Sequence, residues 1–143
     1  MKSFFALFLL FLFISGGCRN TEKDTSKKSG FSKIEFESTT YDFGTIAFKS
    51  DGSCVFSFKN TSETPLLINK VSTSCGCTNP DWPKNPIETG KSGEIKVAYN
   101  TQIPGTFHKS ITVFCNAENS PVKLFIKGEV LPETIKESSS SNQ

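Results

Sequence analysis

The sequence contains few of the residues on which most enzymes and nucleic-acid-binding proteins depend. Its 143 residues include one histidine, His108, and neither a Gly-x-Ser-x-Gly nucleophile turn nor a glycine-rich phosphate loop. No catalytic constellation can therefore be assembled from its motifs. The formal net charge is +2 and no basic block occurs, so the chain lacks the electrostatic footprint of a nucleic-acid-binding protein. These shortages favour a non-catalytic protein whose partners are not nucleic acids.

A long hydrophobic run is also missing. Residues 4–14 are apolar throughout, whereas a helix that spans a bilayer needs about 20 such residues. Lys2 precedes this run and small residues follow it, which is the layout of a secretory signal peptide. Small residues directly before Cys18 resemble a bacterial lipobox, although Ser15 stands where an aliphatic residue is usual. We expect residues 1–17 to be a signal peptide and Cys18 to be lipidated; the alternative is an ordinary signal before an unmodified cysteine.

Lipidation of Cys18 would attach the chain to a membrane without embedding it. A diacylglycerol and an N-acyl chain exceed the two lipid signals that stable attachment needs. We therefore expect a lipid-anchored protein of the cell envelope, in the outer membrane or periplasm of a Gram-negative bacterium, with no cofactor apart from the lipid. Residues 18–30 combine this cysteine with a polar stretch that cannot order itself, and so predict a flexible linker. Residues 132–143 predict a disordered tail.

Residues 31–131 have the length of one domain and show no sustained helical periodicity. Short alternating runs recur between glycine, proline, asparagine and serine clusters, which is typical of an all-β sandwich. We expect about seven strands in an immunoglobulin-like fold, with a bulge or turn at Gly44 and a proline-punctuated loop at residues 79–86. Ile34 and Phe36 should share one face of a first strand, and Tyr41 and Phe43 one face of a second. The inward rows should be Cys54, Phe56 and Phe58; Ile95, Val97 and Tyr99; Ile111, Val113 and Cys115; and Val122, Leu124, Ile126 and Val130.

Three aromatic residues are candidates for a partner surface. If residues 116–121 form a hairpin turn that pairs Cys115 with Val122, then Phe114 and Phe125 lie diagonally across the outer face of two strands. Exposed aromatics of this kind can mark a contact surface. The alternatives are a slipped register or cover by the linker. Trp82, in the proline-punctuated loop, could dock a sugar or peptide, or could simply cap the end of the sandwich.

Several motifs appear in a fixed order that resembles a bacterial family, the domain of unknown function 1573. They are Tyr41-Asp42-Phe43-Gly44-Thr45-Ile46, Phe58-Lys59-Asn60-Thr61, Ser74-Cys75-Gly76-Cys77-Thr78, Pro86-Ile87, Gly105, Lys109, Ile111-Thr112-Val113, Asn116-Ala117 and Gly128-Glu129-Val130. The similarity covers nearly all of residues 36–130. It implies an immunoglobulin-like fold, akin to modules of cilia and centrosome proteins, usually behind a secretion or lipoprotein signal. It implies no activity.

Cysteine pairing has several solutions. In an extended chain the Cα atoms of Cys75 and Cys77 would lie about 6.6 Å apart, at the far edge of the disulfide range of about 4.4–6.8 Å. Gly76 permits a bend, so a bridge between them, two free thiols, or one bridge elsewhere all stay open. Strand ends in an immunoglobulin-like topology favour a bridge from Cys54 to Cys75 or Cys77 over a Cys54–Cys115 bridge. Buried free thiols are the remaining alternative.

Two hypotheses for function follow. The first is a non-catalytic binding or scaffolding module with a protein or glycan partner in the envelope. The alternative is copper or zinc binding through the thiolates of Cys75 and Cys77, with Cys54 or His108 as a third ligand. Thiol redox chemistry is less favoured, since no Cys-x-x-Cys stands at a helix start to lower a thiol pKa.

Overall fold

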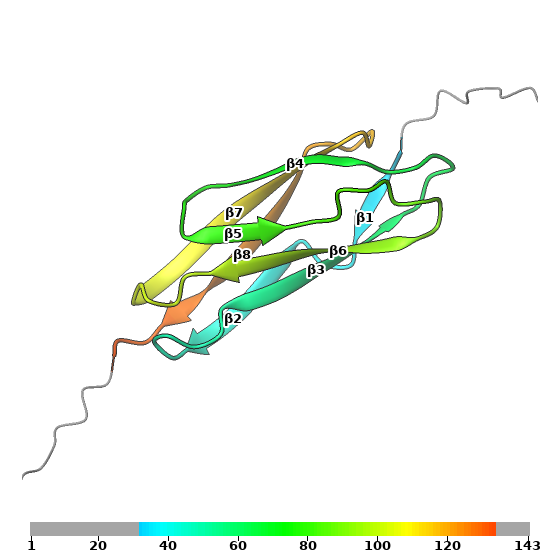
Figure 1. Ribbon diagram of the computed structural model, residues 1–143. Coiled ribbons are helices and arrows are strands. Elements are labelled where there is room, and N and C mark those ends of the chain that lie inside the picture. The colour runs from blue at the N-terminus through cyan, green and yellow to red at the C-terminus, as the bar shows by residue number, and fades with distance from the viewer. Residues whose placement is uncertain (1–31, 134–143) are drawn as a thin grey trace, which may run out of the picture.

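Alternating side chains build eight strands in the computed structural model, which describes residues 32–133 (Figure 1). The strands are β1 (Ile34–Phe36), β2 (Thr40–Ile46), β3 (Ser53–Asn60), β4 (Ile68–Thr73), β5 (Thr78–Asp81), β6 (Ser92–Tyr99), β7 (Gly105–Cys115) and β8 (Val122–Val130). They form two four-stranded sheets with the orders β1-β3-β6-β5 and β2-β8-β7-β4. The expected all-β, immunoglobulin-like sandwich is confirmed. The signal segment, Cys18, the linker and residues 134–143 lie outside the described residues.

The core lies between the two sheets and is built mainly from the expected inward rows. Phe56 and Phe58 of β3 and Ile111 and Val113 of β7 belong to one core cluster, and each of these side chains is at most 2% exposed. Fully burying such a side chain contributes about 1.5–3 kcal/mol relative to its exposed state. In β2, Phe43 packs against the core, whereas 40% of Tyr41 is exposed. No helix long and apolar enough to cross a membrane occurs in residues 32–133.

The first strand changes sheets. β1 pairs antiparallel with β3, and after a short break the chain continues as β2, which pairs parallel with β8 in the other sheet. The β2 register shifts between Asp42 and Thr45, and Gly44 has a φ of 62°. This is the irregularity expected at Gly44, because glycine adopts positive φ at little cost. The Gly44 N–H donates to the Asp42 carboxylate; this bond and then Lys127 lower the pKa of that carboxyl.

Two expectations about strands were wrong. Residues 79–81 were assigned to a loop, but together with Thr78 they form β5 at the edge of its sheet, which raises the strand count to eight. Pro80 argues against a central strand but is tolerated at an edge. The β7–β8 hairpin pairs Val113 with Val122 instead of Cys115 with Val122. The Cys115 N–H donates to the Ser120 hydroxyl, so the ladder ends earlier.

The described chain starts and ends at opposite ends of the sandwich (Figure 1). Ser32 bridges to Ala117 beside the β7–β8 hairpin, at what we call the near end. Leu131 follows β8 and donates its N–H to the Ile46 carbonyl at the far end. The turn between β4 and β5 also lies at the far end (Figure 1). The Cys-Gly-Cys segment therefore lies away from the point where the described chain begins.

Candidate functional site

The turn at the far end contains a disulfide between Cys75 and Cys77. Their Cα atoms are 5.3 Å apart, inside the usual disulfide range and closer than an extended chain would allow. Residues 74–77 bend away from strand geometry, which brings the two sulfurs together. The favoured bridge from Cys54 to either of these cysteines was wrong, since Cys54 is unpaired. Cys75 and Cys77 bond to each other, so neither has a free thiol with which Cys54 could form a bridge.

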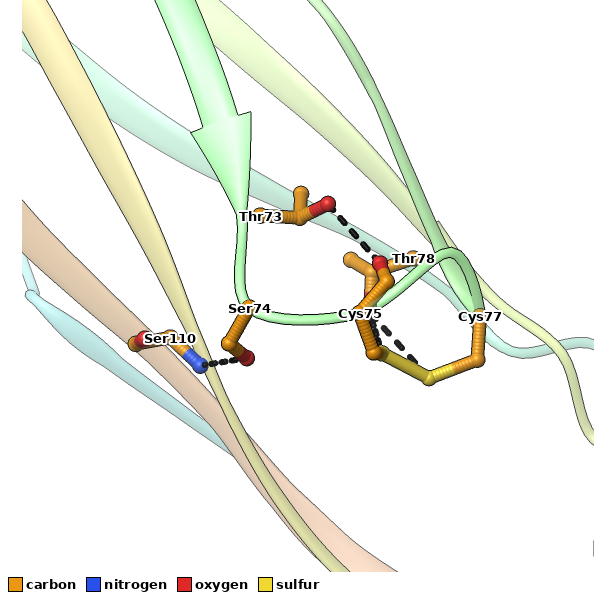
Figure 2. Close-up of a disulfide and its surroundings, with 6 residues drawn as sticks. All are labelled: Thr73, Ser74, Cys75, Cys77, Thr78 and Ser110. Atoms are coloured by element: carbon orange, nitrogen blue, oxygen red, sulfur yellow. Dashed lines mark hydrogen bonds between the residues drawn. A yellow bond between two sulfur atoms is a disulfide. The ribbon is translucent and has the colours of Figure 1, made fainter.

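Hydrogen bonds on both sides hold this turn, as Figure 2 shows for the β4 side. The Thr73 hydroxyl donates to the Cys75 carbonyl at 2.9 Å. The Ser74 N–H donates to the Ser110 carbonyl of β7, and the Ser110 N–H donates in return to the Ser74 hydroxyl. On the β5 side, the Asn100 N–H donates to the Cys77 carbonyl at 2.9 Å. These contacts position the turn without using the sulfur–sulfur bond.

Thr78 is the polar side chain next to both sulfurs. Its Oγ1 lies 3.6 Å from the Cys75 Sγ and 4.0 Å from the Cys77 Sγ. Thr78 is 5% exposed, whereas both cysteines are partly exposed and Gly76 is exposed. The disulfide thus lies in a partly exposed turn, and its sulfurs lie next to the buried hydroxyl of Thr78 (Figure 2). Sequence reasoning gave Thr78 no role; its position directly after the second cysteine was the available signal.

The other two cysteines in the described residues lie inside the core. Cys54 is 5% exposed and Cys115 is 8% exposed, and both are free thiols. Burial raises the pKa of Cys54 to about 11, because desolvation penalises the thiolate. Such thiols behave as small hydrophobic side chains.

The residues proposed as metal ligands do not gather into one site. Across residues 32–133 no group of three histidine, cysteine, aspartate or glutamate side chains is placed to hold a metal ion. His108 stacks on Phe125, with ring centroids 5.4 Å apart. In the disulfide state shown, Cys75 and Cys77 offer no thiolate to copper or zinc.

Phe114 and Phe125 both belong to the outer face of the β2-β8-β7-β4 sheet, but they are not neighbours. Because the hairpin register differs from the expected one, Ser110 and not Thr112 pairs with Phe125. Phe114 pairs instead with Lys70 of β4 and is 38% exposed. Phe125 is half-buried beneath its stack with His108. One exposed aromatic, Phe114, remains on this face.

Trp82 directly follows β5, the edge strand of the β1-β3-β6-β5 sheet. It helps to line a groove of about 540 Å³ with Glu37, Asp81, Glu94 and other residues. Trp82 also packs against the core, and the Lys84 Nζ lies 2.9 Å from the centroid of its ring. A sugar could stack on that face only by displacing the lysine. The three aromatic residues therefore do not form one continuous surface.

The fold defines the class of protein. Two four-stranded sheets, linked where the chain passes from β1 in one sheet to β2 in the other, form an immunoglobulin-like sandwich. The chain belongs to the family described as Protein of unknown function (DUF1573), whose profile matches residues 34–130. The comparison with curated proteins found no match.

Solved structures support the fold. A protein of unknown function from Porphyromonas gingivalis W83 is similar with a TM-score of 0.62 and 19% identity, over 68% of this chain and 46% of that one. This chain thus spans less than half the length of that protein. The PapD-like domain 7 of human CEP192 is similar with a TM-score of 0.61 and 9% identity, over 73% of this chain and 89% of that domain. At these identities the likeness extends to the fold alone.

Proposed function

We propose that this protein is a lipid-anchored lipoprotein of the cell envelope whose sandwich binds a protein or glycan partner without catalysing a reaction. The signal-like residues 1–17 and the lipobox-like residues before Cys18 support the anchor. The family has no described activity, so support for binding must come from the surface of the domain.

Phe114 is the observation that carries the binding proposal. Its ring is 38% exposed on the outer face of a sheet, beside the half-buried Thr112 and opposite Lys70. Covering the exposed part would contribute about 1 kcal/mol from apolar burial alone. A ring of this size, bordered by polar side chains, fits the centre of a small contact surface.

The test of binding is co-purification of the full-length mature protein from native membranes after crosslinking. Phe114→Ser is compared with Val55→Ser, because Val55 is 45% exposed on the outer face of the other sheet. We expect a reproducible partner to be lost in Phe114→Ser and kept in Val55→Ser, with both variants folded. Equal recovery in both variants would remove Phe114 from the contact surface. A loss of several kcal/mol of stability in Phe114→Ser would show that the ring acts in the core instead.

The anchor is tested separately by mass spectrometry of the mature protein. We expect the leading residue to be Cys18 with one diacylglycerol and one N-acyl chain. Release of Cys18→Ser from the membrane fraction would support the same conclusion. A mature product without acyl mass would contradict the anchor and leave the binding test unaffected.

A further inference from the structure

The Cys75–Cys77 disulfide lies in a partly exposed turn, while the free thiols of the same domain are buried. Both of its cysteines are partly exposed beside the exposed Gly76, whereas Cys54 and Cys115 are buried. An incoming thiolate could therefore reach this bond without opening the sandwich. It could not reach Cys54 or Cys115 without doing so.

The fold has little structural need for this bond. A disulfide constrains the unfolded chain more strongly when it closes a longer loop, and this one joins residues only two positions apart. The turn is also fixed by bonds from Thr73, between Ser74 and Ser110, and from Asn100 to Cys77. None of these hydrogen bonds involves a cysteine sulfur, so none has to break when the sulfur–sulfur bond is reduced.

We propose that Cys75–Cys77 is a thiol–disulfide exchange site that accepts two electrons from a dithiol donor at the far end of the sandwich. A disulfide that acts as the acceptor is attacked by the thiolate of its donor. It therefore does not need the Cys-x-x-Cys at a helix start that lowers the pKa of an attacking thiol.

The exchange balances in two steps. A donor thiolate attacks the Cys77 Sγ, forms an intermolecular disulfide and breaks the Cys75–Cys77 bond; the electron pair leaves on the Cys75 Sγ, which takes up a proton. The second donor thiol then loses its proton and attacks the donor sulfur of the mixed disulfide. Cys77 is released and takes up a proton. Two electrons and two protons have passed to this chain, and the donor holds the new disulfide.

Thr78 determines which sulfur leaves. Its hydroxyl is closer to the Cys75 Sγ than to the Cys77 Sγ, at 3.6 Å against 4.0 Å. A hydroxyl that donates to a thiolate stabilises it, and the more stable thiolate is the better leaving group. Thr78 thus acts as a positioning residue for departure of Cys75.

The surroundings suit a reversible site. Hydrogen bonds at Cys75 and Cys77 keep the two reduced sulfurs close together, so that an oxidant can reclose the ring intramolecularly. The loop that holds Cys77 through Asn100 also contains Ile103, which is 47% exposed. This apolar side chain offers a contact for the donor at the same end of the domain.

The first experiment treats the full-length protein with dithiothreitol under native conditions, followed by alkylation and peptide mapping. We expect label on Cys75 and Cys77, none on Cys54 or Cys115, and an unchanged circular dichroism spectrum. Oxidised glutathione should then restore the intramolecular bond. Labelling of Cys54 and Cys115 together with Cys75 and Cys77 would overturn the proposal, because reduction would then require unfolding. Resistance of Cys75–Cys77 to the dithiol, or accumulation of glutathione adducts without reclosure, would overturn it too.

The second experiment tests Thr78 with a matched pair of variants. Thr78→Val removes the hydroxyl and should slow reduction about tenfold, the effect of losing one hydrogen bond to a charged group; Thr78→Ser should keep the wild-type rate. In the reduced protein, Thr78→Val should also shift the alkylation profile of Cys75 to higher pH, which a purely structural role would not do. An unchanged profile would overturn the assignment of Cys75 as the leaving sulfur.

Discussion

Removing the disulfide should lower stability only modestly. Replacing Cys75 and Cys77 together by serine opens a ring that contains three residues, since the bridged positions are two apart. The loop-entropy relation gives a loss of about 1.6 kcal/mol at 25 °C for such a ring. For a domain of this size, that corresponds to a fall in Tm of roughly 6–12 °C.

Equilibrium urea unfolding of the full-length protein measures this loss, with Trp82 fluorescence and circular dichroism as probes. The m-value should stay nearly constant, because the surface exposed on unfolding barely changes. Wild-type protein in excess dithiothreitol is the matched control and should lose the same free energy as the Cys75→Ser/Cys77→Ser variant. A loss above about 4 kcal/mol, as expected for a bridge on which folding depends, would refute the view that hydrogen bonds hold the turn.

Three further outcomes are expected. Asn60→Ala should cost about 3 kcal/mol in urea unfolding, because the fully buried side chain donates to the Thr64 and Ile87 carbonyls and accepts from both the N–H and the hydroxyl of Ser62. Gly93→Ala should cost about 2 kcal/mol by overpacking, since a Cβ there would meet the buried ring of Phe58. Burial raises the pKa of Cys54 from 9.0 to about 11, so its contribution to the free energy of unfolding is fully present below pH 9.0 and should be lost as the pH rises from 9.0 through about 11. The difference in stability between wild type and Cys54→Val across that range measures this contribution. A constant difference would argue against a shifted pKa.

Period-two alternation identified six of the eight strands. The rows of β3, β6 and β7 face the core as expected because their alternation is regular, and a regular strand keeps one face inward. Leu66, Ile68 and Val71 are all buried although they do not share one parity. The register shift between Ile68 and Lys70 produces this pattern, and the hydrophobic periodicity of the sequence does not predict that shift.

Pairings between distant segments were harder to predict than faces. The hairpin register depends on a hydrogen bond from Cys115 to Ser120, which competes with the ladder and leaves no trace in hydrophobic patterning. The pairing of the cysteines was also hard to predict, because it too depends on contacts between distant segments. The motif around Gly76 identified the candidate site, but the bend that brings its two sulfurs together depends on contacts with Ser110 and Asn100, which are distant in sequence.

The parallel pairing of β2 with β8 has a mechanical consequence. Thr40 lies opposite Phe125 and Ile46 opposite Val130, while the described chain begins at one pole of the sandwich and ends at the other (Figure 1). Tension applied through both ends would draw these strands past each other, so that their hydrogen bonds would bear the load together instead of unzipping singly. Forced unfolding is governed by the unfolding rate, and loading these hydrogen bonds together should slow it.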